Sequence, residues 1–78
     1  MQYDYSKLYG AMREKNIIQK QLAKYCGMSE STLNQKLKSK SEFKVCEMIT
    51  IMNYLNLNLS KVDEYFFETK LVKTQETH

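Results

Sequence analysis

Residues 18–37, IQKQLAKYCGMSESTLNQKL, decide the fold, because they predict two short helices joined by a tight turn. The first helix is expected over residues 19–26, and Gly27 supplies the left-handed conformation that ends a helix abruptly. Ser29 is a good N-cap for a second helix over residues 30–38. The apolar residues expected to face the core are Leu22, Ala23, Cys26, Leu33 and Leu37.

Helical spacing also dominates outside this stretch, and the chain has no proline and only two glycines. Three more helices are expected, over residues 4–15, 44–55 and 60–66. Their apolar residues are Tyr5, Leu8, Tyr9 and Met12, then Val45, Met48, Ile49, Met52 and Leu55, and finally Tyr65, Phe66 and Phe67. We predict an all-α fold of five helices in one domain, residues 1–69, followed by a polar C-terminal tail, residues 70–78, that frays.

The chain of 78 residues suffices for one small domain, and its charge is unevenly distributed. Residues 1–40 hold eight Lys and Arg against three Asp and Glu, whereas residues 41–78 hold four Lys against six acids. A basic half suits a polyanionic partner, but it equally suits a solvated helical surface. Charge alone leaves both interpretations open.

Metal sites, disulfides and membrane segments are not expected. Cys26 and Cys46 have no metal-ligand spacing, and both are expected on apolar helix faces as buried free thiols. The first ten residues do not resemble a signal peptide, and no apolar run approaches the ~20 residues that cross a bilayer. We expect a soluble cytoplasmic protein without a cofactor. An enzyme is not expected, because the sequence offers no Cys–His pair at an obvious spacing, carboxylate dyad or phosphate-binding glycine loop.

The helix expected over residues 30–38 has an unusual polar face. Leu33 and Leu37 set its buried direction at about 100° per residue. The residues that point away are Ser31, Gln35 and Lys38, with Thr32 and Asn34 at their flanks. Ser, Thr and Asn are weak helix formers that cost roughly 0.3–0.7 kcal/mol each, so an exposed face made of them needs a reason. Recognition of base edges supplies one, and an ordinary solvated face is the alternative.

The pattern Gln19-x-x-Leu22-Ala23-x-x-x-Gly27-x-Ser29-x-x-x-Leu33 resembles the helix-turn-helix of the Cro/phage-repressor family. Residues 3–67 are similar to a group of small phage-associated proteins of this type. The similar segments are Tyr3–Leu8, Thr32–Leu37, Ser41–Phe43 and Asp63–Phe67. The resemblance implies a compact lambda-repressor-like DNA-binding domain in which the second and third helices form the motif.

The resemblance also implies a Cro-like transcriptional repressor of a phage or prophage. It would bind double-stranded operator DNA as a homodimer in the host cytosol, with the third helix in the major groove. By position in the motif, base readout falls to Glu30, Ser31, Thr32, Asn34 and Gln35. DNA backbone contacts fall to Gln19, Lys20, Ser29, Lys36, Lys38, Lys40 and Ser41. Glu30 fits least well: it either accepts a hydrogen bond from cytosine N4 or simply stabilises the helix N-terminus.

A second function is also open: a protein-binding antirepressor whose partner is the phage's own repressor protein. The same fold could present its third helix to a protein, and a gel shift with genomic fragments discriminates the two functions. The apolar residues available for a dimer interface are Leu57, Leu59, Val62, Tyr65, Phe66 and Phe67. Val62 and Phe66 are expected to complete the core instead.

Overall fold

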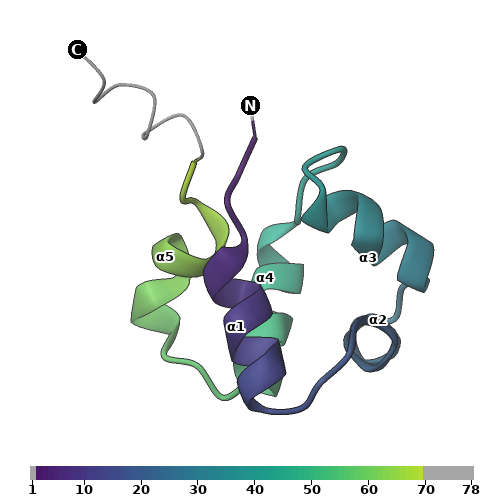
Figure 1. Ribbon diagram of the computed structural model, residues 1–78, viewed down its shortest axis with the longest axis horizontal. Helices are drawn as coiled ribbons and strands as arrows, with labels where there is room; N and C mark the ends of the chain where they lie inside the picture. The colour runs from purple at the N-terminus through teal and green to yellow at the C-terminus, as the bar shows by residue number, and fades with distance from the viewer. Residues whose placement is uncertain (1, 70–78) are drawn as a thin grey trace.

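Five α-helices and one 3-10 turn make up the regular structure of residues 2–69, the part of the chain that the computed structural model describes (Figure 1). They are α1 (Ser6–Glu14), α2 (Gln19–Cys26), α3 (Glu30–Leu37), α4 (Val45–Tyr54), η1 (Leu59–Lys61) and α5 (Val62–Phe66). The predicted compact all-α fold of five helices is confirmed over these residues. None of their helices is long and apolar enough to cross a membrane. The predicted tail, residues 70–78, lies outside the described residues.

Helix α4 is central to the core, since it packs against both α2 and α5. Its inward side is formed by Met48, Ile51 and Met52, which repeat at helical spacing. Val45 and Ile49 were expected in the same stripe but are exposed. At 100° per residue they lie about 70° and about 110° from the buried direction. The largest fully buried side chains are Leu8, Leu22, Leu33, Ile51, Met52, Leu55 and Phe66.

Residues 3–5, before α1, are not helical, although the spacing predicts a helix from residue 4. Tyr3 forms an isolated antiparallel bridge with Thr69, and the N–H of Asp4 donates to the carbonyl of Glu68 at 2.8 Å. The N–H of Tyr3 also donates to Ser39 Oγ at 3.0 Å. The beginning of the described chain therefore lies between the end of α5 and the loop after α3 (Figure 1).

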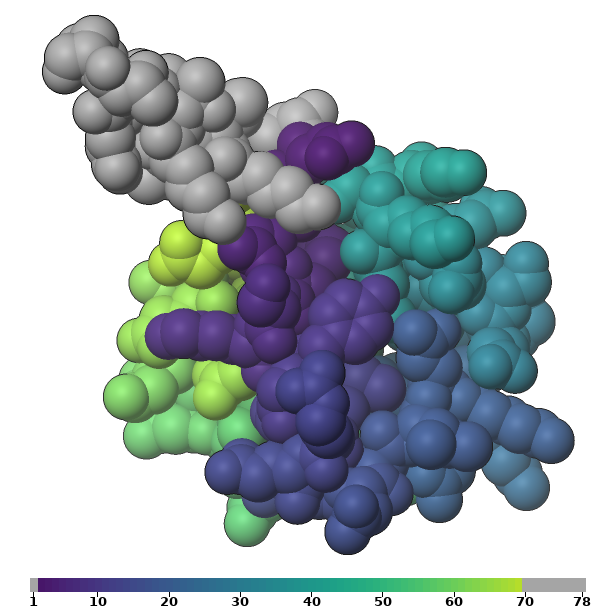
Figure 2. Space-filling model, in the orientation of Figure 1, coloured from purple at the N-terminus to yellow at the C-terminus, as the bar shows by residue number. Residues whose placement is uncertain are grey.

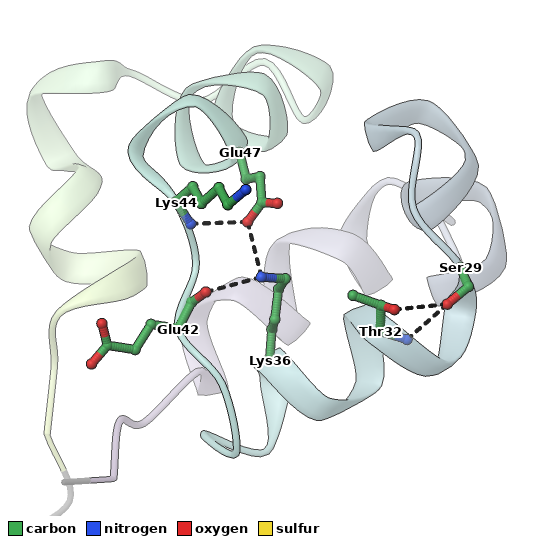
Figure 3. Close-up of polar contacts among 6 residues, drawn as sticks. All are labelled: Ser29, Thr32, Lys36, Glu42, Lys44 and Glu47. Carbon is green, nitrogen blue, oxygen red and sulfur yellow. Dashed lines mark hydrogen bonds and ion pairs between the residues drawn. The ribbon is translucent and has the colours of Figure 1, made fainter.

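The turn between α2 and α3 has the predicted geometry. Gly27 has a φ of 74°, in the left-handed region. Ser29 Oγ accepts the N–H of Thr32 at 3.1 Å and donates to Thr32 Oγ1 at 2.9 Å (Figure 3). The left-handed glycine and the Ser29 cap are thus both confirmed, and they set the angle at which α3 leaves α2.

Lys36 is a buried charged residue that joins α3 to α4 (Figure 3). Lys36 is only 8% exposed, and its Nζ donates a hydrogen bond to the carbonyl of Glu42 at 2.9 Å. Nζ also lies 3.3 Å from Glu47 Oε1, and that oxygen accepts the N–H of Lys44 at 2.9 Å. Lys36 therefore does not fit the predicted role of a DNA backbone contact, because its ammonium is buried and already has two partners.

The two cysteines differ in exposure. Cys26 is half-buried and Cys46 is exposed, and both are free thiols. Burial raises the pKa of the Cys26 thiol. The expectation that Cys46 is buried is wrong, since it lies about 170° around α4 from the buried direction. Within residues 2–69, no three His, Cys, Asp or Glu side chains gather as they would around a metal ion.

The Ser29 cap can be tested by a matched pair of alanine variants. Ser29→Ala removes the acceptor of the Thr32 N–H and should lower the free energy of unfolding by about 1 kcal/mol. Ser31→Ala changes an exposed position inside the same helix and should alter stability by less than about 0.5 kcal/mol. Urea unfolding followed by circular dichroism measures both. Equal effects of the two substitutions would contradict a capping role.

The Lys36 contacts predict a larger loss of unfolding free energy than the Ser29 cap does. Lys36→Ala leaves the Glu42 carbonyl without its donor and the Glu47 carboxylate without its counter-charge. We expect unfolding free energy to fall by about 1–3 kcal/mol. Lys38→Ala, at an exposed position two residues away, serves as the control and should stay within about 0.5 kcal/mol of wild type. A Lys36→Ala protein as stable as the Lys38→Ala protein would show that the buried contacts are energetically neutral.

Candidate functional site

Helices α2 and α3 form one end of the molecule (Figures 1 and 2). The side chains at the predicted base-readout positions lie as the helical spacing indicates. Glu30, Ser31, Thr32 and Gln35 are exposed and Asn34 is half-buried. We call the exposed side of residues 19–41 the α2–α3 surface.

A shallow depression of about 460 Å³ lies on the α2–α3 surface. Its lining consists of Glu30, Ser31, Asn34, Gln35, Lys38 and Lys40. Two ammonium groups and one carboxylate give the depression a positive balance, and Lys20 and Lys24 are exposed on α2 nearby in sequence. The lining offers hydrogen bonds and cations but no apolar anchor.

Two of the predicted site residues hold α2 and α3 together. Asn34 Nδ2 donates to Gln19 Oε1 at 3.3 Å, and both residues are half-buried. Gln19 was expected to contact the DNA backbone, whereas its side-chain oxygen accepts a hydrogen bond from Asn34. This contact fixes the start of α2 against the middle of α3.

The remaining predicted backbone contacts divide into two groups. Lys20, Lys38, Lys40 and Ser41 are exposed. Ser29 is also exposed, but its hydroxyl caps α3. With Lys36 buried, the cations of the α2–α3 surface come from α2 and from the residues that follow α3, not from α3 itself.

A second concave surface was not predicted from the sequence. It measures about 230 Å³ and lies where the N-terminal segment, the start of α4 and the end of α5 meet. Its lining consists of Tyr3, Tyr5, Glu42, Phe43, Val45, Met48, Phe66 and Phe67. We call it the aromatic groove.

Packed rings form the floor of the aromatic groove. Tyr5, Phe43 and Phe66 are buried and meet edge to face, with ring centroids 5.1–6.3 Å apart. Burial raises the pKa of Tyr5 to about 12, with smaller contributions from Tyr3 and Glu42, so its hydroxyl is neutral at physiological pH. The floor is therefore uncharged at physiological pH and consists of packed aromatic rings.

The walls of the groove are apolar and open to solvent. Phe67 is 48% exposed and Val45 is 68% exposed, while Tyr3 is half-buried with its ring edge-on to Phe67. Phe67 was expected among the apolar residues at the end of the last helix and as a candidate for a dimer interface. The available signal was the presence of aromatic residues near both ends of the chain, but no spacing rule pairs Tyr3 with Phe67.

Comparison with known proteins identifies relatives of this chain. The family model described as "Protein of unknown function (DUF739)" matches residues 1–69. Among solved structures, the chain is similar to the modulator of repression (MOR) of the temperate bacteriophage TP901-1 from Lactococcus lactis, solved in solution. The two share 39% sequence identity with a TM-score of 0.72, and the match covers 86% of this chain and 90% of the other. No curated protein matches.

These findings overturn the predicted membership of the Cro/phage-repressor family. The matching family model is not that of the Cro repressors, and the similar solved structure is of a modulator of repression. The main functional prediction, a DNA-binding Cro-like repressor, is wrong on the same grounds, and the DNA-contact roles assigned through that resemblance lose their basis.

The features that suggested Cro are those that build the turn. Leu22 and Leu33 are fully buried, Gly27 is left-handed and Ser29 caps α3. Such residues specify a helix-turn-helix shape whatever its surface binds. The expected association with phages is supported by the similar structure. Because the family model spans residues 1–69, this chain belongs to the family of proteins of unknown function designated DUF739.

Proposed function

We propose that this protein is a modulator of phage repression that binds the phage's repressor protein and lowers its occupancy of operator DNA. The observation that carries the proposal is the likeness to the phage TP901-1 modulator of repression, at 39% identity and a TM-score of 0.72. The match covers 86% of this chain and 90% of the other. The repressor acts on DNA in the bacterial cytosol, so the same proposal assigns this protein to that compartment.

The exposed apolar side chains support a protein partner. Large apolar residues that stand in solvent are Ile18, Tyr25, Val45, Ile49, Leu59 and Phe67. Contacts with a nucleic acid backbone are made chiefly by cations and hydrogen-bond donors, whereas the cores of protein interfaces are rich in aromatic and aliphatic anchors. The aromatic groove places two of these exposed residues, Val45 and Phe67, at one concave site.

Binding in a one-to-one complex is enough to relieve repression by mass action. If the bound repressor cannot hold its operator, free modulator at about nine times the dissociation constant leaves a tenth of the repressor active. No catalytic step or second domain is needed. The size of the chain is therefore compatible with the proposed activity.

The proposal predicts the outcome of a gel-shift titration. A labelled operator fragment is first saturated with the repressor of the same phage or prophage, and this protein is then added. The repressor–operator band should disappear in proportion to the added protein, and titration calorimetry should give a saturable complex between the two proteins.

Two controls make the titration decisive. This protein alone should leave the operator fragment unshifted at the same concentrations and at physiological salt. A repressor from an unrelated phage should keep its operator band. The proposal fails if the protein binds no repressor in the calorimeter, or if it shifts the operator by itself.

A further inference from the structure

Helices α1 to α4 all end in the same way, with a left-handed residue just beyond the last helical turn. In each case the N–H of the next residue donates to the carbonyl five residues back, at 2.8–3.0 Å. Glycine adopts this conformation without strain, and asparagine tolerates it. The left-handed residues have φ between 57° and 74° and are Asn16, Gly27, Ser39 and Asn56. Serine, at the end of α3, is the exception among these four.

The side chain of Ser39 makes a contact that a glycine could not make. Ser39 Oγ accepts the N–H of Tyr3 at 3.0 Å, across 36 residues of sequence. Its backbone φ of 63° is unfavourable for a residue with a β-carbon. Glycine would relieve that strain but has no side-chain oxygen. The hydroxyl therefore distinguishes this helix end from the others.

The hydrogen bond to Ser39 holds the N-terminal segment, residues 2–5, on one of its two sides (Figure 1). On the other side, the N–H of Asp4 donates to the carbonyl of Glu68, and Tyr3 pairs with Thr69. Among the described helices, α3 packs against α2 and not against α1 or α5. The contact between Ser39 and Tyr3 thus joins parts of the fold that helix packing leaves apart.

The surface between the N-terminal segment and the end of α3 is hollow. A depression of about 330 Å³ lies there, and its lining includes Tyr3 from the segment and Leu37 and Lys38 from the end of α3. Close packing therefore does not fix Tyr3 against α3. The hydrogen bond to Ser39 Oγ supplies the directional contact at this place.

Tyr3 passes this restraint on to an exposed ring. Its own ring lies edge-on to that of Phe67, with the centroids 6.3 Å apart. Phe67 is 48% exposed, and Tyr3 is half-buried. An exposed side chain that already has its bound orientation loses less conformational entropy when a partner covers it. Ser39 can therefore affect binding at Phe67 through Tyr3.

We propose, on the basis of the function proposed above, that Ser39 is a positioning residue for repressor binding. Its hydroxyl holds Tyr3 beside Phe67, so that this aromatic pair has its binding orientation before the repressor arrives. Ser39 itself does not contact the repressor. When the hydroxyl is absent, Tyr3 occupies this place in only a fraction of the molecules, and the apparent affinity falls by that fraction.

Two substitutions at position 39 separate the hydroxyl from the backbone strain. Ser39→Gly removes Oγ and relieves the left-handed strain, so the urea midpoint of unfolding should stay close to that of wild type. Ser39→Ala removes Oγ and keeps the strain, so the midpoint should fall. Calorimetry with the purified repressor should show an affinity loss of about threefold to tenfold for both variants. If Ser39 were merely structural, affinity would follow the unfolding midpoint instead.

The free protein provides a second readout and a matched control. In NMR spectra, Ser39→Gly should accelerate solvent exchange of the Tyr3 amide and shift the ring-proton resonances of Phe67. Asn56→Gly makes the equivalent change at the end of α4, where the left-handed residue is exposed. That variant should leave the Tyr3 exchange rate and the repressor affinity unchanged.

The outcomes distinguish the role of Ser39 from the proposed function. If the wild-type protein does not bind the repressor, the proposed function is refuted, and the role of Ser39 in binding falls with it. If wild type binds and Ser39→Gly binds equally well, the positioning role is overturned and the function stands. An unchanged Tyr3 exchange rate in Ser39→Gly also overturns it, as does an equal loss of affinity in Asn56→Gly.

Discussion

The buried ammonium of Lys36 is the contact on which both surfaces of this protein depend. It bonds the Glu42 carbonyl and the Glu47 carboxylate, so α3 is held against the start of α4 by a polar contact. The same contact positions the loop after α3, where Phe43 enters the core, and Val45, the first residue of α4, which remains exposed. One lysine is thereby withdrawn from the α2–α3 surface, and the same loop forms an edge of the aromatic groove.

A helix-turn-helix is a backbone geometry, and that geometry alone does not determine whether a protein binds DNA. Leu22, Gly27, Ser29 and Leu33 serve burial, chain reversal and capping, all of which the shape requires. A pattern built on such residues identifies the fold with good physical reason. It carries no information about the partner, because the partner is chosen by residues that the fold leaves free.

The physics of local structure explains which features could be predicted. The bounds of α2 and the Ser29 cap follow from spacing and hydrogen bonding within a few residues, and both were predicted correctly. Lys36 lies about 80° from the buried direction of α3, where burial depends on what the neighbouring helix offers. The groove depends on the bridge between Tyr3 and Thr69, residues from opposite ends of the described chain, and no local rule brings them together.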